Sequence, residues 1–468
     1  MRQKIWILCQ TPGNYRELAA KYDISSIAAI VCANRGVPFS NFDSFFNVSP
    51  DNLHHPSLLK DIDTLTDILI KKIAEKKKIR VIGDYDIDGV CATYILTDGL
   101  RRLGGICDYA IPHRIFDGYG INMRLIDEAL SDGVDTVITV DNGIAAASEV
   151  KHGKENGLTM LVTDHHEIPN ETDENGEKRY LFPGADAVVD VKRPDETYPY
   201  PDICGAAIAW KVVLLLEEKM HTDISAFDYV EEAGFATIGD IMTLQGENRT
   251  MASLGLAALR NTKNSGLRAL IKACGISPEE IKCHHVGFRL GPCINATGRL
   301  ESAMDAEALL FSEGSEAEEL AERLVTLNRT RQELTGQAAA RCEEMVGENP
   351  DPVLVVYDAD IHESVAGIVA GRLKEKYYRP TIVLTDSEGL IKGSARSIPG
   401  YNMFERLNEC RELFVKFGGH PMAAGMSLEK ENLETFRRFL NTHHGMSEED
   451  MTEKVYIDAL VPFNRFDI

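Results

Sequence analysis

The chain has 468 residues, of which 44% are hydrophobic and 26% are charged, a composition typical of a globular protein rather than a collagen-like, coiled-coil or disordered one. At roughly 150 residues per domain, this length predicts about three structural units. Fifty Lys and Arg residues against 73 Asp and Glu residues give a net charge of −23. This charge disfavours non-specific binding to duplex DNA or to an anionic membrane, but it leaves room for a local basic channel and a carboxylate-rich metal site.

Membrane association is not expected, because no apolar run approaches the roughly 20 residues that a membrane-spanning helix needs. The apolar stretch 5–9 is too short for the hydrophobic region of a signal peptide. Ten cysteines are scattered without a CxxC pair. This pattern predicts reduced thiols in a cytoplasmic protein rather than a disulfide framework.

The first half of the chain predicts an α/β fold. Residues 1–78 are expected to be mostly helical, with a loop near 38–56. Residues 79–240 alternate short apolar runs with helical patterns, which is typical of a parallel sheet built from βαβ units. We expect strands at 79–83, 109–112, 136–140 and 159–163, an edge strand at 185–191, and helices at 90–103, 123–130 and 206–220.

The second half begins with a long helix from residue 313 to about 346 that contains no proline. Such a helix would span roughly 50 Å and suits a strut between domains. A second, smaller α/β unit is expected to follow. Its predicted elements are a strand at 353–357, a helix at 365–376, strands at 381–385 and 390–395, and a loop that holds Gly418, Gly419 and His420.

The resulting domain organisation has five parts, and the last stretch, 455–461, is expected to be one strand of a further domain. The parts are an N-terminal extension at 1–78, a catalytic domain at 79–312, a connecting helix at 313–348, a second domain at 349–445 and a tail at 446–468.

A run of three aspartates carries the first chemical signal. Asp84, Asp86 and Asp88 occupy alternate positions just after a predicted strand, and open α/β sheets bind ligands at the carboxyl ends of their strands. Three like charges this close repel one another unless a cation compensates them, and a divalent metal ion is the simplest such cation. Taken alone, the segment could equally be an acidic turn that caps the next helix.

Further polar side chains follow other predicted strands. Asp141 comes directly after 136–140, and the segment 164–166, Asp-His-His, follows 159–163. Asp240 lies among apolar residues, where an unpaired buried carboxylate would be costly, so a metal or strong donors are expected beside it. The sequence contains four His-His pairs, and only the pair at 165–166 follows an aspartate at a predicted strand end. The other three pairs are assigned to loops and helices.

The predicted ligands are mostly carboxylate oxygens with one imidazole. This set favours Mn²⁺ or Mg²⁺ over a structural zinc ion, which would prefer thiolates. Enough ligands are present for two ions about 3.5–4 Å apart, an arrangement typical of phosphoryl hydrolysis.

Four segments in this order resemble the four motifs of the DHH phosphoesterase superfamily. They are 84–89 (Asp-Tyr-Asp-Ile-Asp-Gly), 140–143 (Val-Asp-Asn-Gly), 164–166 (Asp-His-His) and 239–240 (Gly-Asp). Segments 393–397 and 418–425 resemble the DHH-associated domain. Segments 291–300 and 362–370 are similar to one branch, the RecJ single-strand DNA exonucleases, and the turn at 118–120 and residues 34–36 fit that branch too.

The resemblance implies a role for each matching residue. Asp86, Asp88, Asp141, His165 and Asp240 would hold two ions of Mn²⁺ or Mg²⁺, with Asp84 as a further ligand or an orienting group. His166 would contact the scissile phosphate and act with Asp141 and Asp240 in catalysis.

The resemblance implies a cleft between the catalytic and DHH-associated domains that is too narrow for duplex DNA. It also implies that a second set of residues binds phosphates across this cleft from the metal ions. Arginine suits bidentate phosphate binding, and glycine lets the backbone approach a phosphate closely. The implied residues are Arg299, Ser394, Arg396, Gly419 and His420.

The activity implied by the resemblance is metal-dependent 5′→3′ hydrolysis of single-stranded DNA to mononucleotides in DNA repair and recombination. The resemblance also implies a cytoplasmic monomer that works with a helicase and a single-strand-binding protein. The alternative is a DHH-family phosphodiesterase acting on short oligonucleotides or cyclic dinucleotides, although such relatives lack the 291–300 segment and the 1–78 extension. A catalytically inactive scaffold is disfavoured because all four motifs are intact.

The chain departs from the family pattern at several positions. Ile82 stands where some relatives carry a metal-binding histidine, Cys293 where relatives commonly have arginine, and Asp190-Val191 replaces a more usual Asn-Pro. Relatives normally continue into an oligonucleotide-binding fold, whereas this sequence ends near the first strand of one. A weaker hold on long single strands is therefore expected.

Overall fold

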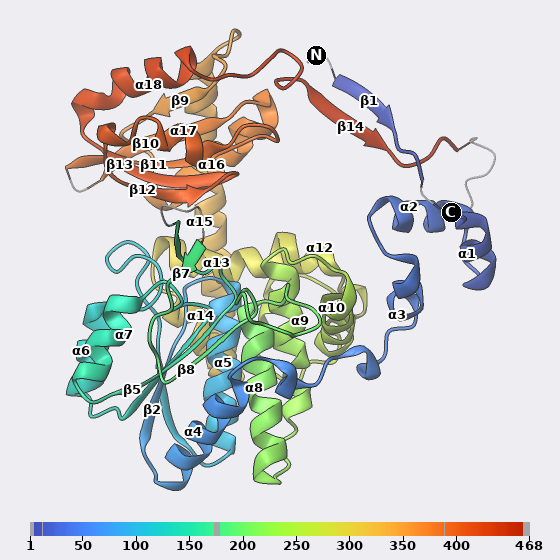
Figure 1. Ribbon diagram of the computed structural model, residues 1–468, viewed down its shortest axis with the longest axis vertical. Coiled ribbons are helices and arrows are strands. Elements are labelled where there is room, and N and C mark those ends of the chain that lie inside the picture. Colours follow the sequence, from blue (N-terminus) through green and yellow to red (C-terminus); the bar gives the residue numbers. More distant parts are fainter. Residues whose placement is uncertain (1–3, 12, 173–177, 388, 462–468) are drawn as a thin grey trace. The chain divides into compact units, whose positions relative to one another are not determined.

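The computed structural model describes residues 4–11, 13–172, 178–387 and 389–461, and the chain divides into two compact units (Figure 1). The larger unit comprises Ser40–Asn328, and the smaller unit comprises Met1–Phe39 together with Arg329–Ile468. Each unit buries a hydrophobic core of its own. The five-part domain organisation predicted from the sequence stays a prediction.

The larger unit is built on a five-stranded parallel sheet, which confirms the expected α/β fold. Helices cover both faces, so successive residues of one strand enter different cores: Val188 packs with one cluster and Val189 with the other. Burial on both faces explains why the strands read as continuous apolar runs. In spatial order the strands are β3 (Ile106–Ala110), β2 (Lys78–Ile82), β4 (Thr136–Val140), β5 (Thr159–Asp164) and β8 (Ala187–Asp190).

Two strands of this sheet differ most from the prediction, while the other boundaries agree to within one residue. The strand expected at 109–112 begins earlier, at Ile106, because Gly104 (φ +84°) and Gly105 turn the chain directly after the preceding helix. It ends before Pro112, which lacks the N–H that a ladder needs. The edge strand expected at 185–191 is limited to β8.

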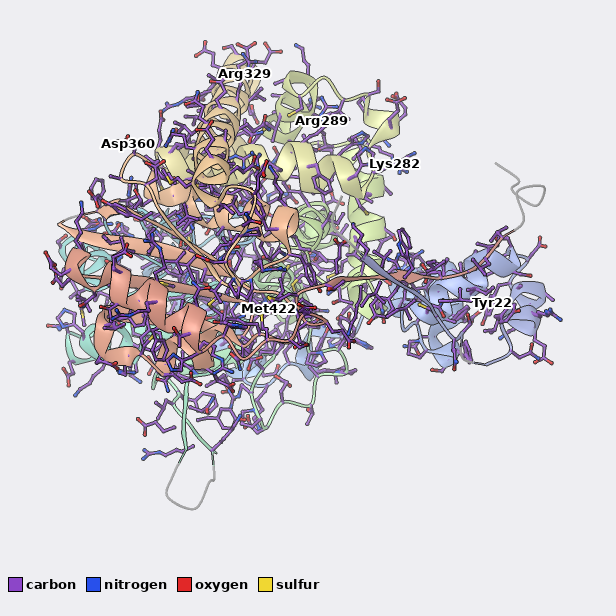
Figure 2. The ribbon with its side chains drawn as sticks, turned by 90° about the horizontal axis from the view of Figure 1, so that it is seen from above. Tyr22, Lys282, Arg289, Arg329, Asp360 and Met422 are labelled. Atoms are coloured by element: carbon purple, nitrogen blue, oxygen red, sulfur yellow. The ribbon has the colours of Figure 1, made fainter. Side chains whose placement is uncertain are left out.

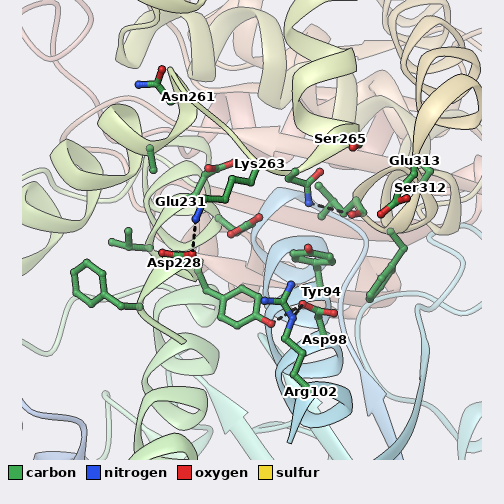
Figure 3. A pocket seen from close by; sticks show the side chains of 18 of the residues that line it. Tyr94, Asp98, Arg102, Asp228, Glu231, Asn261, Lys263, Ser265, Ser312 and Glu313 are labelled. Atoms are coloured by element: carbon green, nitrogen blue, oxygen red, sulfur yellow. Dashed lines mark hydrogen bonds and ion pairs between the residues drawn. The ribbon is translucent and has the colours of Figure 1, made fainter. Parts of the chain in front are cut away.

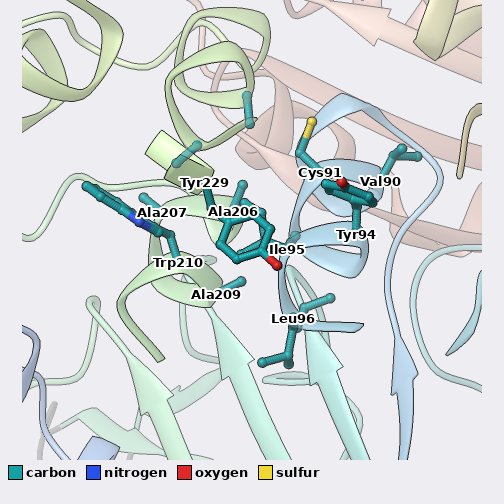
Figure 4. Packing of buried hydrophobic residues seen from close by; sticks show 14 of the residues in the cluster. Val90, Cys91, Tyr94, Ile95, Leu96, Ala206, Ala207, Ala209, Trp210 and Tyr229 are labelled. Carbon is teal, nitrogen blue, oxygen red and sulfur yellow. The ribbon is translucent and has the colours of Figure 1, made fainter. Parts of the chain in front are cut away.

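Helix α5 (Ile87–Arg102) fixes the position of the acidic segment. It begins three residues before the predicted start because Asp86 is its N-cap, with Oδ1 accepting hydrogen bonds from the backbone N–H of Asp88 and Gly89 at 3.0 and 3.2 Å. Figure 4 shows this helix packed against α8 (Gly205–Met220), with Ile95 of α5 close to Ala206 of α8. Gly99 permits this close approach, since a Cβ there would lie 2.7 Å from the Val213 methyl groups.

The remaining helices of the larger unit do not all pack on this pair, since Met123–Ser131 and Ala147–Glu155 pack into the core on the other face of the sheet. Within the described residues, none is both long and apolar enough to cross a bilayer. The predicted long helix is confirmed as α15 (Gly314–Val346), which has 33 residues. The others of eight residues or more are α4 (Ile62–Ala74), α6 (Met123–Ser131), α7 (Ala147–Glu155), α9 (Val230–Gly239), α10 (Gly246–Leu259), α11 (Ser265–Ala273), α13 (Gly291–Leu300) and α14 (Met304–Phe311).

The smaller unit contains a second five-stranded sheet of mixed direction, in which β9 and β10 are parallel and the other pairs antiparallel. Its order is β12 (Phe414–His420), β13 (Ala423–Leu428), β11 (Leu390–Arg396), β10 (Thr381–Ser387) and β9 (Leu354–Tyr357). The helices that follow α15 in this unit are α16 (Glu363–Tyr377), α17 (Met403–Asn408) and α18 (Leu433–Thr442).

The prediction that Gly418, Gly419 and His420 lie in a loop is wrong. These residues form the end of β12, where Gly418 pairs with Gly425 and His420 with Ala423. Pairing with β13 satisfies their backbone groups, and the turn lies after them, at 421–422.

The N-terminal segment is not only helical. It contains α1 (Tyr15–Lys21), α2 (Ser26–Asn34) and α3 (Phe42–Phe46), but it opens with strand β1 (Lys4–Leu8). This strand pairs in parallel with β14 (Glu453–Ile457), which is the strand expected at 455–461. The partner lies far away in sequence, so local patterning could not reveal the pair. Residues 462–468 of the predicted tail lie outside the described residues.

A buried ion pair anchors the start of the larger unit to its core. The side chains of Lys211 and Glu247 are 1% and 0% exposed, and Nζ lies 2.6 Å from Oε1. Tyr198 Oη donates a hydrogen bond to Glu247 Oε2 at 2.6 Å. The backbone of His54 joins the network at both ends: its N–H donates to Glu247 at 2.9 Å, and its carbonyl accepts from Lys211 at 2.9 Å.

Replacing one partner of this pair is expected to destabilise the fold. Glu247→Gln leaves the Lys211 ammonium buried without a counter-charge, a change that costs about 3–5 kcal/mol, measurable as a lower free energy of unfolding in urea. Asp67→Asn is the control, because Asp67 is 70% exposed and pairs with Lys219 at the surface. That pair is worth about 1 kcal/mol or less. Equal losses in the two variants would contradict the role assigned to Glu247.

Candidate metal centre

The carboxyl ends of β2, β4 and β5 bring the predicted acidic and imidazole side chains to one edge of the parallel sheet. Asp141 follows β4 directly and adopts φ +60°, a left-handed conformation that is uncommon for a residue with a side chain. Its carbonyl accepts a hydrogen bond from Tyr119 Oη at 2.8 Å. Gly205, the first residue of α8, packs against it, since a Cβ there would lie 2.5 Å from Asp141 Cβ. The surrounding chain therefore holds this backbone in place.

Five of the predicted site residues converge around His165. Ligand atoms of Asp141, His165 and His166 lie within 4.8 Å of one another, and so do those of Asp88, His165 and Asp240. His165 Nε2 is 3.1 Å from Asp141 Oδ1 and 3.5 Å from Asp88 Oδ2. These residues come from four separate segments of the chain, and only the fold brings them together.

Asp84 and Asp86 lie next to this cluster in sequence but belong to neither group of three. Asp84 is buried, its Oδ1 accepts a long hydrogen bond from Gly120 N–H at 3.4 Å, and its Oδ2 has no donor among the described residues. Asp86 uses Oδ1 to cap α5. The structure therefore shows a local role for Asp86 besides the predicted metal ligation.

The electrostatics fit a hard divalent cation. Burial, followed by repulsion from neighbouring aspartates, raises the pKa of Asp141 well above its usual range and that of Asp240 to about 8. Burial and the charge of Asp86 likewise raise the pKa of Asp84. Asp141 Oδ1 is buried and accepts no hydrogen bond among the described residues. Carboxylates in this condition need a compensating positive charge, and oxygen ligands with an imidazole suit Mn²⁺ or Mg²⁺.

Asp164 positions the histidine pair. Its Oδ1 accepts hydrogen bonds from His166 Nδ1 at 2.7 Å and from the N–H of His165 at 2.8 Å, while its Oδ2 accepts from Ile144 N–H at 2.9 Å. Although burial opposes the effect, the Asp164 carboxylate raises the pKa of His166 to about 9. The side chain of His166 is 46% exposed and that of His165 is 10% exposed. The contact with Asp164 thus favours the protonated form of His166, whose side chain is about half exposed.

Sequence reasoning missed three contributors to this site. Gly205 and Ala206 donate backbone N–H groups to Asp88 at 2.6 and 2.8 Å, so the first turn of α8 holds that carboxylate. Arg114 lies 4.7 Å from the centre of the Tyr85 ring, beside the acidic segment. The signal for Arg114 was its place just before the Gly118-Tyr119-Gly120 turn, whereas nothing local marked the start of α8.

Arg299 lies on α13, which contacts the acidic segment directly. Asn295 Oδ1 accepts a hydrogen bond from Ile87 N–H at 2.7 Å. Gly298 packs so closely that a Cβ there would be 2.5 Å from the Tyr85 carbonyl oxygen. The segment 291–300 thus supports the loop that carries Asp86 and Asp88.

The other predicted phosphate-binding residues lie together in the smaller unit. Arg396 on β11 and His420 on β12 both pair with Ala423 of β13, the strand between them, so all three occupy one row of the sheet. Ser394 shares the face of Arg396, and both side chains lie against Gly367 of α16. Gly419 approaches β13 closely, since a Cβ there would be 2.4 Å from the Ala423 carbonyl oxygen.

The positions that depart from the family pattern are all buried. Ile82 and Cys293 are 0% and 1% exposed. Asp190 ends β8 in register with Asp164, and burial together with the Asp164 charge raises its pKa to about 8.

A separate cavity of about 550 Å³ lies beside the second half of α5 (Figure 3). Its lining includes Tyr94, Asp98, Arg102 and Glu231, with Asp98 accepting a hydrogen bond from Tyr229 Oη at 2.6 Å and pairing with Arg102 at 2.7 Å. The cavity shares no lining residue with the metal centre.

Comparison with known proteins assigns the family. Residues 78–237 match the DHH family, N-terminal domain, and residues 351–443 match the DHHA1 domain. The chain is 34% identical over 406 residues to the single-stranded-DNA-specific exonuclease RecJ of Salmonella typhimurium, covering 81% of this chain and 68% of that relative. The chain belongs to the RecJ family. To the Bacillus subtilis RecJ it is 37% identical over 455 residues, covering 95% of this chain and 56% of that relative.

Solved RecJ structures confirm the predicted fold. The crystal structure of RecJ in complex with Mn²⁺ from Thermus thermophilus matches with a TM-score of 0.82 at 28% identity, covering 98% of this chain and 65% of that one. Another exonuclease RecJ bound to manganese matches with a TM-score of 0.72 at 30% identity, covering 84% of this chain and 98% of that one. This chain thus spans between about half and two thirds of the length of several RecJ relatives.

Mn²⁺ is expected to raise the midpoint temperature of thermal unfolding. A cation that binds only the folded carboxylates stabilises the folded state by about 2.7 kcal/mol at a concentration of 100 Kd, and a chelator should reverse the shift. Asp141→Asn should lose most of the shift. Asp127→Asn should keep it, because Asp127 is an exposed carboxylate that pairs with His152. Equal Mn²⁺ shifts in the two variants would contradict the placement of the site.

Proposed function

We propose that this RecJ-family chain is a metal-dependent exonuclease that hydrolyses single-stranded DNA in the 5′→3′ direction to mononucleotides, in DNA repair and recombination. The observation that carries the proposal is the convergence of Asp88, Asp141, His165, His166 and Asp240 at one edge of the parallel sheet. The relatives named as single-stranded-DNA-specific exonucleases support the substrate class. A cytoplasmic monomer that works with a helicase and a single-strand-binding protein belongs to the same proposal.

The metal centre would hold two Mn²⁺ or Mg²⁺ ions through Asp86, Asp88, Asp141, His165 and Asp240, with Asp84 beside them. When bound, such ions lower the pKa of water so that a hydroxide is available at neutral pH, and they neutralise charge on the phosphate. Asp141 and Asp240 would be among the residues that hold these ions. Burial, and after it repulsion from neighbouring aspartates, raises their pKa values, and a bound cation would compensate the charge of both carboxylates.

His166 would stabilise the negative charge that develops on the phosphate during attack. Its Nδ1 is held by Asp164 at 2.7 Å, and its Nε2 lies 3.3 Å from the Tyr119 hydroxyl, so neighbouring side chains orient the ring before a substrate binds. As a cation, it donates a charge-assisted hydrogen bond, which is stronger than a neutral one. A donor held in place beforehand needs little reorganisation at the moment of reaction.

Phosphates further along the strand would bind to Arg299 and to four residues of the smaller unit, Ser394, Arg396, Gly419 and His420. The positively charged side chains among them supply local attraction despite the net charge of −23. The cleft expected between the two domains stays a prediction, and strand selectivity by its width belongs to this proposal.

An end-labelled oligonucleotide assay tests the activity and its polarity together. With Mn²⁺, a single strand labelled at the 5′ end should release its label as a mononucleotide, while the 3′-labelled strand shortens progressively. Asp141→Asn should abolish cleavage because it removes a ligand charge, and Asp127→Asn should leave cleavage unchanged. If only di- to pentanucleotides are cut, the protein is instead a DHH-family phosphodiesterase that acts on short oligonucleotides. No cleavage with any divalent ion would contradict both readings.

Arg396→Ala tests the phosphate-binding residues of the smaller unit. Loss of a charge-assisted hydrogen bond to phosphate should weaken binding of single-stranded DNA about tenfold, seen as a higher KM with a smaller change in kcat. Lys430→Ala is the control, since Lys430 is a 64% exposed lysine of the same unit. A drop in kcat at constant KM would contradict a binding role for Arg396.

A further inference from the structure

Two cysteines of the larger unit lie in contact although they are 19 positions apart in sequence. Cys274 directly follows α11, Cys293 lies in the first turn of α13, and their sulfur atoms are 3.8 Å apart. Both carry reduced thiols in this structure. A disulfide needs a sulfur–sulfur distance of about 2.05 Å, so closure requires a movement of about 1.8 Å. Side-chain rotation at the end of a helix can supply much of that movement.

The two thiols have different surroundings. Cys293 is 1% exposed, its S–H donates to the Arg289 carbonyl at 3.1 Å, and its sulfur accepts a hydrogen bond from Asn328 Nδ2 at 3.5 Å. Cys274 is partly exposed. Cys274 is therefore the more exposed residue of the pair, and Cys293 is the buried one.

Arg289 favours the thiolate of the more exposed cysteine. It is an exposed residue of the segment Val286–Leu290, labelled in Figure 2, and its guanidinium donates a hydrogen bond to the Cys274 carbonyl. The contact with the Cys293 sulfur and the nearby Arg289 charge lower the pKa of Cys274, although burial opposes them. A thiolate is the form that reacts with peroxides and disulfides.

We propose that Cys274 and Cys293 form a reversible disulfide when the protein meets a peroxide, with Cys274 as the reactive thiol and Cys293 as the resolving thiol. The Cys274 thiolate attacks one peroxide oxygen, the O–O bond breaks, and the sulfur becomes a sulfenic acid as hydroxide leaves. The Cys293 sulfur then attacks Cys274 Sγ, the S–O bond breaks, and the departing hydroxide takes the Cys293 proton to form water. In sum, two thiols and one hydrogen peroxide yield one disulfide and two waters.

The position of the bond connects it to the metal centre. Cys293 lies two residues before Asn295, whose side chain accepts the hydrogen bond from Ile87 N–H between Asp86 and Asp88. A disulfide would tie the end of α11 to the helix that supports this acidic loop. Formation of this disulfide does not depend on the proposed nuclease activity. A chain without nuclease activity could still form the bond, and an active nuclease could lack it.

Mass spectrometry of the intact 468-residue chain tests the proposal. After treatment with hydrogen peroxide and blocking of remaining thiols, digestion should yield a cross-linked peptide containing Cys274 and Cys293. It should be lighter by about 2 Da than the two reduced peptides together, and dithiothreitol should separate it. Cys283→Ser is the matched control, because Cys283 is an exposed thiol outside the pair. This variant should keep the cross-link.

A trapping experiment assigns the order of the two thiols. In Cys293→Ser the resolving thiol is missing, so a dimedone probe should label Cys274 as a sulfenic acid, whereas the wild-type chain should show little labelling at that position. Peroxide treatment that oxidises Cys283 while leaving Cys274 and Cys293 reduced would overturn the proposal. So would a cross-link from Cys274 to a different cysteine.

Discussion

Repulsion among carboxylates at the carboxyl edge of the parallel sheet is the constraint on which the larger unit depends. Asp84, Asp88 and Asp141 are all at most 2% exposed, and burial with mutual repulsion raises the pKa of Asp84 and Asp141. The protein offsets part of this repulsion by its own means. The first turn of α8 donates two N–H groups to Asp88, and His165 lies between Asp88 and Asp141. One oxygen each of Asp84 and Asp141 accepts no hydrogen bond among the described residues, although His165 Nε2 lies 3.1 Å from that of Asp141. A divalent cation would compensate the negative charge that remains there.

The backbone around these side chains is held by packing rather than by local preference. Asp141 keeps a left-handed conformation. Gly205 packs against it, and the Tyr119 hydroxyl donates a hydrogen bond to its carbonyl. Asn295 and Gly298 of α13 fix the acidic segment from the other side. A metal site needs its ligands within a few tenths of an ångström, and such supporting contacts supply that precision. The same helix carries Cys293, so thiol chemistry there would act on an element that supports the site.

The sequence indicated which strand-end residues would meet, because parallel strands place their carboxyl ends at one edge. Apolar runs predicted β2, β4 and β5, and the polar residues that follow each run had to meet there. The same reasoning could not distinguish the structural roles of neighbouring side chains. Asp86 and Asp88 look equivalent in the sequence, yet one caps α5 and the other binds the start of α8. Asp164 looked like part of a motif, and only the structure shows that it orients His166.

Tertiary structure alone decided the features that depend on partners far away in the chain. β1 exists because it pairs with β14, and Gly418 to His420 form a strand because β13 satisfies their backbone groups. The contact between Cys274 and Cys293 likewise arises from two helices whose packing no spacing rule predicts. Hydrophobic periodicity and strand-end chemistry are local and can be read from the sequence. Pairing partners, hydrogen-bond assignments and close approaches depend on where the rest of the chain folds.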